Sequence, residues 1–318
     1  MRTLAAFLAA LSLSGSASAG PASSSAAASG MLEGMTFDVA MTLVDPGAAP
    51  RTVLRFHPRP GATATYETRS TMQMDLSIAM PDGQKVAMPL GEALPTMVMT
   101  AKNTVGNQLP NGMFPVRIEQ LGARVEGQTS SEVAAAMAEA LGTMKGMAFD
   151  LLVDPSGRPA QVDVTGTADA AISQAVQQMA DQMADQMAHF PTEAVGQGAK
   201  WTVDLEMSLG GLDLVVTQTN TLVASTADSV DYTSELVMSM GKGAIAIPGL
   251  PPGANPEIKR FRGSGTGAMR TDLATLASSG KMTMDIDMEM AIASGAGGAD
   301  GLSIAMAMHQ TSEVRPAN

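Results

Sequence analysis

The chain has 318 residues, a formal net charge of −12, 27 methionines and no cysteine. Without cysteine there are no disulfides, iron–sulfur clusters or thiolate nucleophiles. The acidic balance argues against nucleic acid and anionic membrane surfaces as partners. Apolar residues make up 45% of the chain but aromatic residues only 3%. The hydrophobic core therefore has to be built mainly from aliphatic and thioether side chains.

The first residues have the features of a secretory signal peptide. In residues 1–19, Arg2 supplies the positive charge, residues 4–13 the apolar stretch, and Ala-Ser-Ala at residues 17–19 the cleavage site. The apolar stretch is too short to span a bilayer, and no later run is long enough. We therefore expect an exported protein, periplasmic or extracellular, that is soluble and has no transmembrane segment.

Residues 20–33, rich in Ser, Ala and Gly, predict a flexible leader, and residues 34–318 a single β-rich domain. Most of this domain alternates between apolar and polar residues, which is typical of half-buried strands. The longest run extends from Tyr66 to Met80, and a second methionine-rich run from Met282 to Met290. Turn sequences such as Pro81-Asp82-Gly83 separate the runs, so neighbouring strands should be antiparallel. We predict a mainly β (α+β) fold, a curved antiparallel sheet or half-barrel.

Two segments break the alternation and predict amphipathic helices. Thr129 and Glu132 form a capping box before the alanine-rich residues 133–141. In residues 168–189, apolar side chains recur every three or four positions and form one stripe. The members of this stripe are Ile172, Val176, Met179, Met183 and Met187. Such a helix is not stable alone in water, so we expect one or both helices to pack on the apolar face of the sheet.

Two segments of the chain share the same predicted order of elements. Residues 149–164 and residues 269–290 are each predicted to contain a strand, an aspartate, a turn with glycine and a second strand. We hypothesise two similar halves, residues 34–165 and residues 195–316, with the helix at 168–189 between them.

Several short features carry a resemblance to known proteins. Phe190-Pro191 leaves the predicted helix, residues 195–201 (Val-Gly-Gln-Gly-Ala-Lys-Trp) open a strand, and residues 263–267 begin a later strand that reaches Asp272 and a methionine-rich hairpin. In these positions the chain resembles an uncharacterised family of secreted bacterial β-rich proteins of unknown function, which implies no catalytic residue. The layout also looks like the half-barrel of LolA-type lipoprotein carriers, which implies helices over the apolar concave side of a curved sheet.

The methionine-bearing faces are the candidate site. They are either ordinary core, in which methionine fills irregular gaps, or a surface that accepts acyl chains or lipidated segments. We predict that a hydrophobic ligand is held between the sheet and the covering helices. The residues predicted to line it are Met72, Met74, Met80, Met179, Met183, Met187, Met282, Met284 and Met288.

Other chemistry has weaker support. Met-x-Met pairs suit Cu(I), and Met306-Ala307-Met308-His309 is the best local candidate, but His309 should point to the opposite strand face from Met308. The glycine-rich residues 263–267 lack the context of a nucleotide loop, and relief of crowding in a curved strand is the simpler explanation. The alternation also matches outer-membrane strands, but seven Phe, two Tyr and one Trp are too few for two aromatic girdles.

No set of residues composes a nucleophile, a base and an orienting partner, so we expect a binding protein and not an enzyme, with no cofactor and no metal site. Its expected partner is a lipid or a lipidated protein. The alternative is a cell-envelope structural or protein-interaction module without a small-molecule ligand, and a sheet edge without protecting Lys or Pro would favour it. Cu(I) binding by methionine is the weaker alternative.

Overall fold

The computed structural model describes residues 36–80, 84–89, 95–127, 138–139, 141–142, 145–154, 159–166, 190–209, 212–240, 255–293 and 302–317. These residues contain fifteen strands: β1 (Thr36–Asp45), β2 (Thr52–Val53), β3 (Thr63–Ala79), β4 (Lys85–Pro89), β5 (Thr96–Val105), β6 (Phe114–Glu126), β7 (Ala148–Val153), β8 (Pro159–Thr165), β9 (Ala194–Val195), β10 (Lys200–Leu209), β11 (Leu212–Ser225), β12 (Ser229–Met240), β13 (Asn255–Asp272), β14 (Ser278–Ala293) and β15 (Leu302–Pro316). The two predicted methionine-rich runs correspond to β3 and to part of β14.

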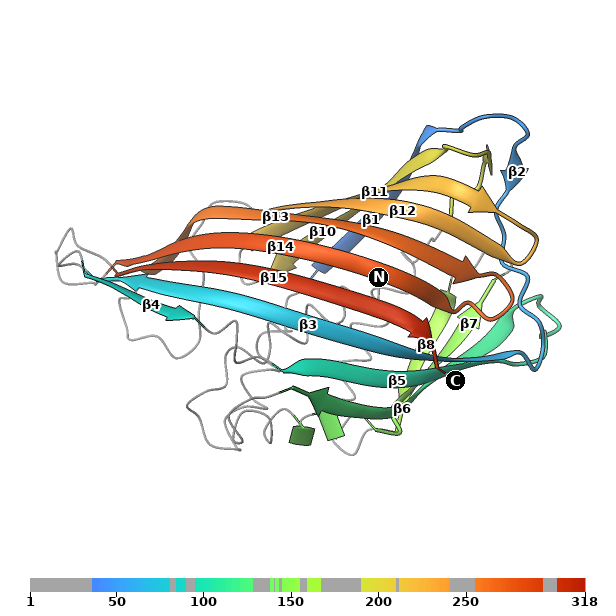
Figure 1. Ribbon diagram of the computed structural model, residues 1–318. Coiled ribbons are helices and arrows are strands. Elements are labelled where there is room, and N and C mark those ends of the chain that lie inside the picture. The colour runs from blue at the N-terminus through green and yellow to red at the C-terminus, as the bar shows by residue number, and fades with distance from the viewer. Residues whose placement is uncertain are drawn as a thin grey trace.

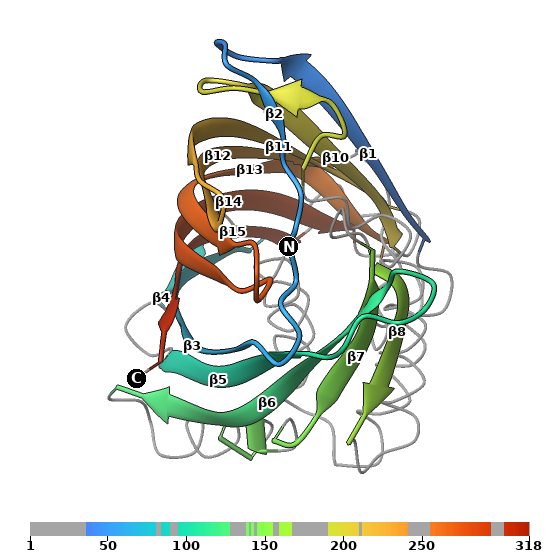
Figure 2. The ribbon, with the colours of Figure 1, turned by 90° about the vertical axis from the view of Figure 1, so that its right-hand side faces the viewer.

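Thirteen of these strands form one antiparallel sheet, shown in Figure 1. Its order is β1-β10-β11-β12-β13-β14-β15-β3-β5-β6-β7-β8, with β4 paired to β3, while β2 and β9 form a separate pair. Figure 2 shows that the sheet curves strongly around an interior and does not close, with β1 and β8 at the two ends of the strand order. The prediction of a mainly β, curved antiparallel sheet is confirmed.

Two meanders make up this sheet. One contains β10 to β15, and the other contains β3 and β5 to β8, so they fall within the two hypothesised halves, residues 195–316 and residues 34–165. β1 belongs to the first half in sequence but pairs with β10 of the second. The relation of the halves by duplication stays a prediction.

The helix predictions fall mostly beyond the described part of the chain. Of the first predicted helix, helical residues are described only at 138–139 and 141–142. The predicted helix at 168–189, with Met179, Met183 and Met187, lies outside the described residues, as do the predicted signal peptide and leader. No amphipathic helix is present in the part that the structure describes. Within that same part, no helix combines the length and the hydropathy needed to cross a membrane.

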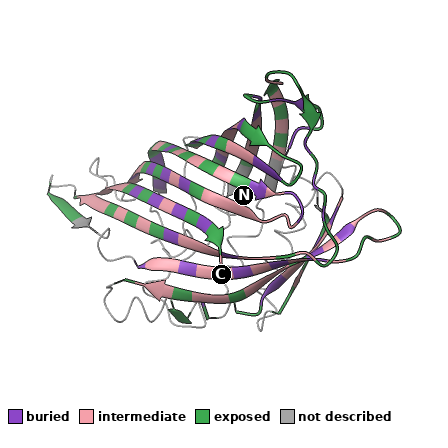
Figure 3. Cartoon of the chain, turned by 45° about the vertical axis from the view of Figure 1, so that its right-hand side comes forward, coloured by how far each residue is buried: buried purple, intermediate pink, exposed green. Residues whose placement is uncertain are grey.

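Burial alternates along the strands with period two, visible as stripes in Figure 3. In β14, the side chains of Met282, Met284 and Ile286 are buried, whereas Asp285 and Asp287, on either side of Ile286, are exposed. Side chains at successive strand positions point to opposite faces, so one face of the sheet is apolar and the other is charged.

The apolar face points to the inside of the curve. Leu276, in the hairpin between β13 and β14, packs against two clusters: one contains Trp201 and Leu222, and the other contains Val105 and Val116. These residues come from β10 and β11 and from β5 and β6, which lie on opposite walls of the curved sheet (Figure 2). The two walls therefore present the same kind of face to each other, and we name it the interior face.

One end of the interior is crossed by residues 46–62, which we name the strap. The strap connects β1 to β3, which lie at distant places in the strand order, and it crosses the open end of the curved sheet from one wall to the other (Figure 2). Backbone hydrogen bonds hold it along the way: the N–H of His57 donates to the carbonyl of Leu273 at 2.8 Å, and the N–H of Gly61 to that of Val105 at 2.8 Å.

A network of ion pairs ties the outer face of β15, β3 and β6 together. Glu67 accepts hydrogen bonds from Arg124 at 2.8 Å and from Arg315 at 2.7 Å, and Glu126 accepts from Arg69 at 2.6 Å and from Arg124 at 2.9 Å. The bond from Arg124, followed by that from Arg315, lowers the pKa of Glu67. The bonds from Arg69 and then Arg124 lower the pKa of Glu126.

The network predicts that the free energy of unfolding decreases at acid pH. Because both carboxyl groups have lower pKa values in the folded chain than in the unfolded chain, their contribution is complete above the ordinary glutamate pKa and is lost as the pH falls through the lowered values. We expect the free energy of unfolding, measured by urea titration from neutral pH to about pH 3, to fall over this window. Glu67→Gln should make that fall smaller, and Glu235→Gln, an exposed position on β12, should leave it unchanged.

Candidate functional site

The interior face is organised in rows that cross the strands, because residues opposite each other in an antiparallel pair point to the same side of the sheet. We name one of these rows the methionine row. It consists of Val216, Met238, Gly263, Ile286, Met308 and Met74, on β11, β12, β13, β14, β15 and β3 in turn. The row contains no hydrogen-bonding side chain, so it is a continuous apolar band across six strands.

The structure brings together several of the methionines predicted to line a site. Met284 belongs to the cluster around the methionine row, with Met72 and Met74 packed against it. Met282, 7% exposed, lies two residues away on β14, and Met288 lies opposite Phe261 on β13 and Met306 on β15. Met80 lies just beyond the end of β3, is 43% exposed, and is not part of the cluster.

Two methionines of this cluster, Met238 and Met308, were not among the predicted site residues. Both follow the same alternation as the residues that were named, so the pattern that identified Met284 was sufficient to find them. Their position in the row depends on pairing between strands, which the alternation of one strand does not specify.

Glycines on β13 give the methionines room. Gly263 and Gly265 lie on the interior face opposite Met238 and Leu236. A Cβ atom at Gly263 would lie 2.5 Å from the Cε atom of Met238 and 2.7 Å from its Cβ atom. The side chain of Met238 therefore occupies the space above the glycine, which agrees with the interpretation of the glycine-rich run as relief of crowding.

A second row, which we name the polar belt, contains four small polar residues and lies near the methionine row. It runs through Asn220, Ser234, Gly267, Met282, Ser312 and Ser70, on the same six strands as the methionine row. The hydroxyl of Ser234 donates to Oδ1 of Asn220 at 2.6 Å, and the hydroxyl of Ser70 donates to that of Ser312 at 3.3 Å. The four polar side chains of the belt are buried and uncharged.

Between the polar belt and the methionine row lies a third row, which contains Gln310. Its neighbours in the row are Met284 on β14 and Met72 on β3. Gln310 is 1% exposed, and neither its Oε1 nor its Nε2 atom has a hydrogen-bond partner among the described residues. The buried indole N–H of Trp201 also has no partner in that part of the chain. Buried polar groups are rarely left unpaired, so both positions are exceptional.

Aromatic side chains gather at the end of the interior beneath the strap. Phe190 lies with its ring centroid 5.3 Å from that of Phe56 on the strap, 6.4 Å from that of Trp201 and 6.4 Å from that of Tyr232. We name these four residues the aromatic plug. The pKa of the Tyr232 hydroxyl is raised above its ordinary value by burial, and a hydrogen bond with Thr271 offsets part of this rise.

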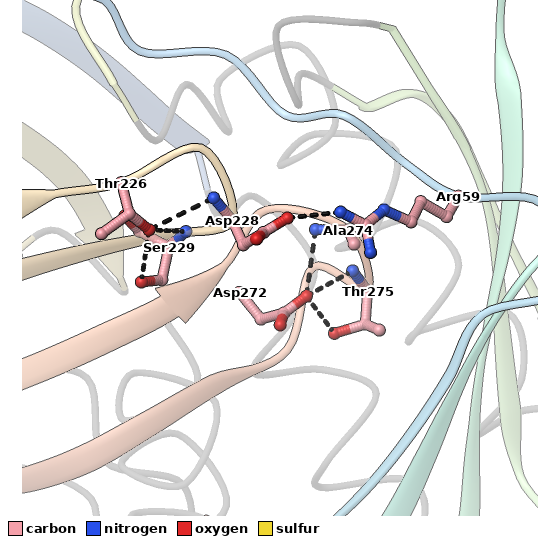
Figure 4. A network of polar contacts seen from close by, with 7 residues as sticks. All are labelled: Arg59, Thr226, Asp228, Ser229, Asp272, Ala274 and Thr275. Carbon is pink, nitrogen blue, oxygen red and sulfur yellow. Dashed lines mark hydrogen bonds and ion pairs between the residues drawn. The ribbon is translucent and has the colours of Figure 1, made fainter.

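The hairpin between β13 and β14 bends inwards beside the plug, and polar contacts shape this bend (Figure 4). One carboxylate oxygen of Asp272 accepts hydrogen bonds from the N–H of Ala274 at 3.0 Å and from the N–H and hydroxyl of Thr275 at 2.8 and 2.9 Å. Arg59 on the strap pairs with Asp228 in the neighbouring hairpin. Asp272 thus shapes a turn, which gives a structural role to one residue of the sequence resemblance.

The hairpin is also fastened to the opposite wall. The amide of Asn103 on β5 donates to the carbonyl of Thr275 at 3.2 Å, and its oxygen accepts a hydrogen bond from the hydroxyl of Tyr66 at 3.0 Å. Leu276 adopts a φ of 61°, which is unusual for a branched side chain. The plug, the strap and this hairpin therefore lie together at one end of the interior, where the hairpin contacts both walls.

The candidate copper ligands are divided between the two faces. Met308 is buried on the interior face, whereas His309 is exposed and its Nδ1 atom lies 2.7 Å from Oδ1 of Asp285. Met308 and His309 therefore point apart, as their adjacent strand positions predict. Among the described residues, no three His, Cys, Asp or Glu side chains gather in a way that could hold a metal ion.

No protein-family model matches the chain, and neither does any curated protein. Among solved structures, the chain is similar to the toluene transporter TodX of P. putida, with 9% identity, 82% of this chain and 91% of that chain covered, and a TM-score of 0.20. It is also similar to a mutant porin of Rh. blastica, with 8% identity, 80% and 100% covered, and a TM-score of 0.19. A loop-deletion mutant of OmpT, an outer membrane protein of Vibrio cholerae, has 8% identity, 81% and 100% covered, and a TM-score of 0.15. TM-scores this low support no argument about fold or function.

The packing of Met238 over Gly263 makes a specific prediction. Gly263→Ala should lower the free energy of unfolding by about 1–3 kcal/mol, because the added methyl group overpacks the interior face. Gly122→Ala on β6 is the matched control, since a Cβ atom there would meet nothing within 4 Å. Urea unfolding of both variants is the measurement, and equal stabilities would show that the interior face adapts freely at Gly263.

Proposed function

We propose that this protein is an exported binding protein that holds a lipid, or another hydrophobic ligand such as a lipidated segment, on the interior face of its curved sheet. The observation that carries the proposal is the composition of that face. It is mostly apolar, rich in methionine, free of buried charge in the described residues, and bordered at one end by the aromatic plug. Sites for apolar ligands combine an apolar lining with a few polar groups, as this face does.

The distribution of charge supports the proposal. No Asp, Glu, Lys, Arg or His is buried among the described residues. On the outer face, by contrast, β14 exposes Asp285 and Asp287, and β13 exposes Arg260 and Arg262. Charges outwards and methionines inwards favour a protein with water outside and an apolar ligand inside. Strands that face a bilayer need the opposite arrangement.

Methionine itself supports the proposal. Its unbranched thioether side chain has three rotatable bonds and adapts to irregular shapes, which is why flexible binding surfaces use it. In this proposal the predicted helix at 168–189 covers the interior face with Met179, Met183 and Met187. The ligand then lies between these methionines and those of the sheet, Met72, Met74, Met282, Met284 and Met288, as the resemblance to LolA-type carriers implies.

Native mass spectrometry of the protein purified from its own envelope, with organic extraction, is the direct test. We expect a stoichiometric lipid to copurify. Delipidated protein should then bind single-chain lipids with an affinity that rises roughly fourfold for each added CH2, because burial of a CH2 contributes about 0.8 kcal/mol. Fluorescence of Trp201, the only tryptophan, is a suitable readout since it lies on the same face. A clean apo mass together with no dependence on chain length would contradict the proposal.

A second candidate function is favoured by strand β1. It ends the strand order and pairs, in the described part of the chain, only with β10. β1 contains neither lysine nor proline, whereas β8 at the other end begins with Pro159. An unprotected strand edge is suited to adding a strand from a partner, so β1 supports the alternative of an envelope protein-interaction module.

A substitution on β1 distinguishes the two functions. Ala40 is exposed, and Ala40→Lys places a charge on the edge strand without touching the interior face. If β1 recruits a partner, cross-linking in intact envelopes should yield an adduct that this variant weakens, while lipid binding stays unchanged. An adduct that is equally abundant in the variant would exclude β1 as its docking edge.

A further inference from the structure

We infer that the ligand carries an uncharged polar group, with a hydrogen-bond donor beside an acceptor, and that Gln310 binds this group. The inference rests on the proposed function and specifies its ligand as an uncharged amphiphile, such as a monoacylglycerol or a fatty amide. It follows from three observations on the interior face: an unpaired amide, the absence of buried charge, and the position of this amide between two zones of different polarity.

The amide of Gln310 is the first observation. Its side chain is 1% exposed and lies on the interior face between Met284 and Met72, neither of which is a strong hydrogen-bond partner. The next interior residue along β15 is Ser312, and its hydroxyl accepts a hydrogen bond from the hydroxyl of Ser70 at 3.3 Å. Both polar atoms of Gln310 thus lack a partner among the described residues. Burying an unpaired amide is costly, and a bound group that supplies one donor and one acceptor removes that cost.

The absence of buried charge decides the chemical class. A carboxylate or phosphate headgroup placed on this face would need a cation beside it, because burying an unpaired charge costs far more than burying a neutral polar group. In the described residues the buried polar side chains are all neutral amides and hydroxyls. A hydroxyl, ester or amide headgroup satisfies Gln310 without such a partner.

The position of Gln310 sets the orientation of the ligand. On one side of its row lies the polar belt, with Asn220 and Ser234, and beyond the belt lies the aromatic plug. On the other side β14 continues with apolar interior residues from Met284 to Ile292, about 26 Å of strand at about 3.3 Å per residue. The polar group therefore lies at the belt and the hydrocarbon chain along the methionines, away from the aromatic plug.

The first experiment compares headgroups on one chain. Delipidated protein is titrated with dodecanoyl glycerol, dodecanoate, dodecyl phosphate and dodecyl trimethylammonium, below their micelle concentrations, with Trp201 fluorescence and calorimetry as readouts. We expect dodecanoyl glycerol to bind about tenfold more tightly than any charged ligand. If the charged ligands bind as tightly as dodecanoyl glycerol, the inference is wrong, although a hydrophobic site still exists.

The second experiment removes the amide. Gln310→Met replaces it with a side chain of similar size that matches its neighbours. Affinity for dodecanoyl glycerol should fall about tenfold, while that for dodecyl trimethylammonium should change little. The matched control is Gln73→Met, the same chemical change at an exposed position on the outer face of the adjacent β3. It should leave all affinities unchanged.

Stability separates a binding role from a structural one. Because the amide has no partner in the described chain, ligand-free Gln310→Met should be at least as stable as the parent protein. A marked loss of stability would show that Gln310 holds the fold together and would overturn its assignment. If none of the ligands binds to the parent protein, the proposed function itself fails, whereas equal binding of all headgroups contradicts only the inference about Gln310.

Discussion

Strand register is the constraint on which the interior of this protein depends. From β10 to β15 and on to β3, each strand is aligned so that its apolar positions meet those of its neighbours. A slip of one residue in any strand would move its methionines to the outer face and its charges to the inside. The irregularities at Leu222/Ala224 and Ile258/Arg260 lie towards the ends of the strands. The central rows therefore remain continuous.

Given this register, methionine and aromatic residues have separate tasks. The methionines pack along the centre of the interior face, and the side chain of Met238 fills the space above Gly263. The aromatic residues gather at the end that the strap crosses, where Phe56, Phe190 and Trp201 pack ring against ring. Flexible side chains suit a surface that adapts to a ligand, and rigid rings suit a permanent closure.

Between these two zones the interior becomes polar without becoming charged. In the polar belt, Ser234 donates a hydrogen bond to Asn220, and Ser70 donates one to Ser312. The amide of Gln310, by contrast, has no hydrogen-bond partner among the described residues. Polar groups that are left unpaired in a folded protein tend to mark functional sites, because selection removes them where they have no use. Along the interior face a neutral polar belt is followed by the apolar methionine row. This order of polarity matches an amphiphile more closely than a pure hydrocarbon.

The sequence alone determined that the fold is mainly β and antiparallel, that the runs at residues 66–80 and 282–290 are strands, and that methionine predominates on one face of each. These features follow from the period-two alternation and from turn residues, which are local properties of the chain. Only the tertiary structure decided that β1 pairs with β10, that the strap crosses the end of the sheet, and that Phe56 meets Phe190. It also decided that Gln310 lies unpaired among methionines, while the equally polar Gln73 is exposed. Such contacts join residues far apart in the chain, and their free energy depends on which strands become neighbours, which no local pattern specifies.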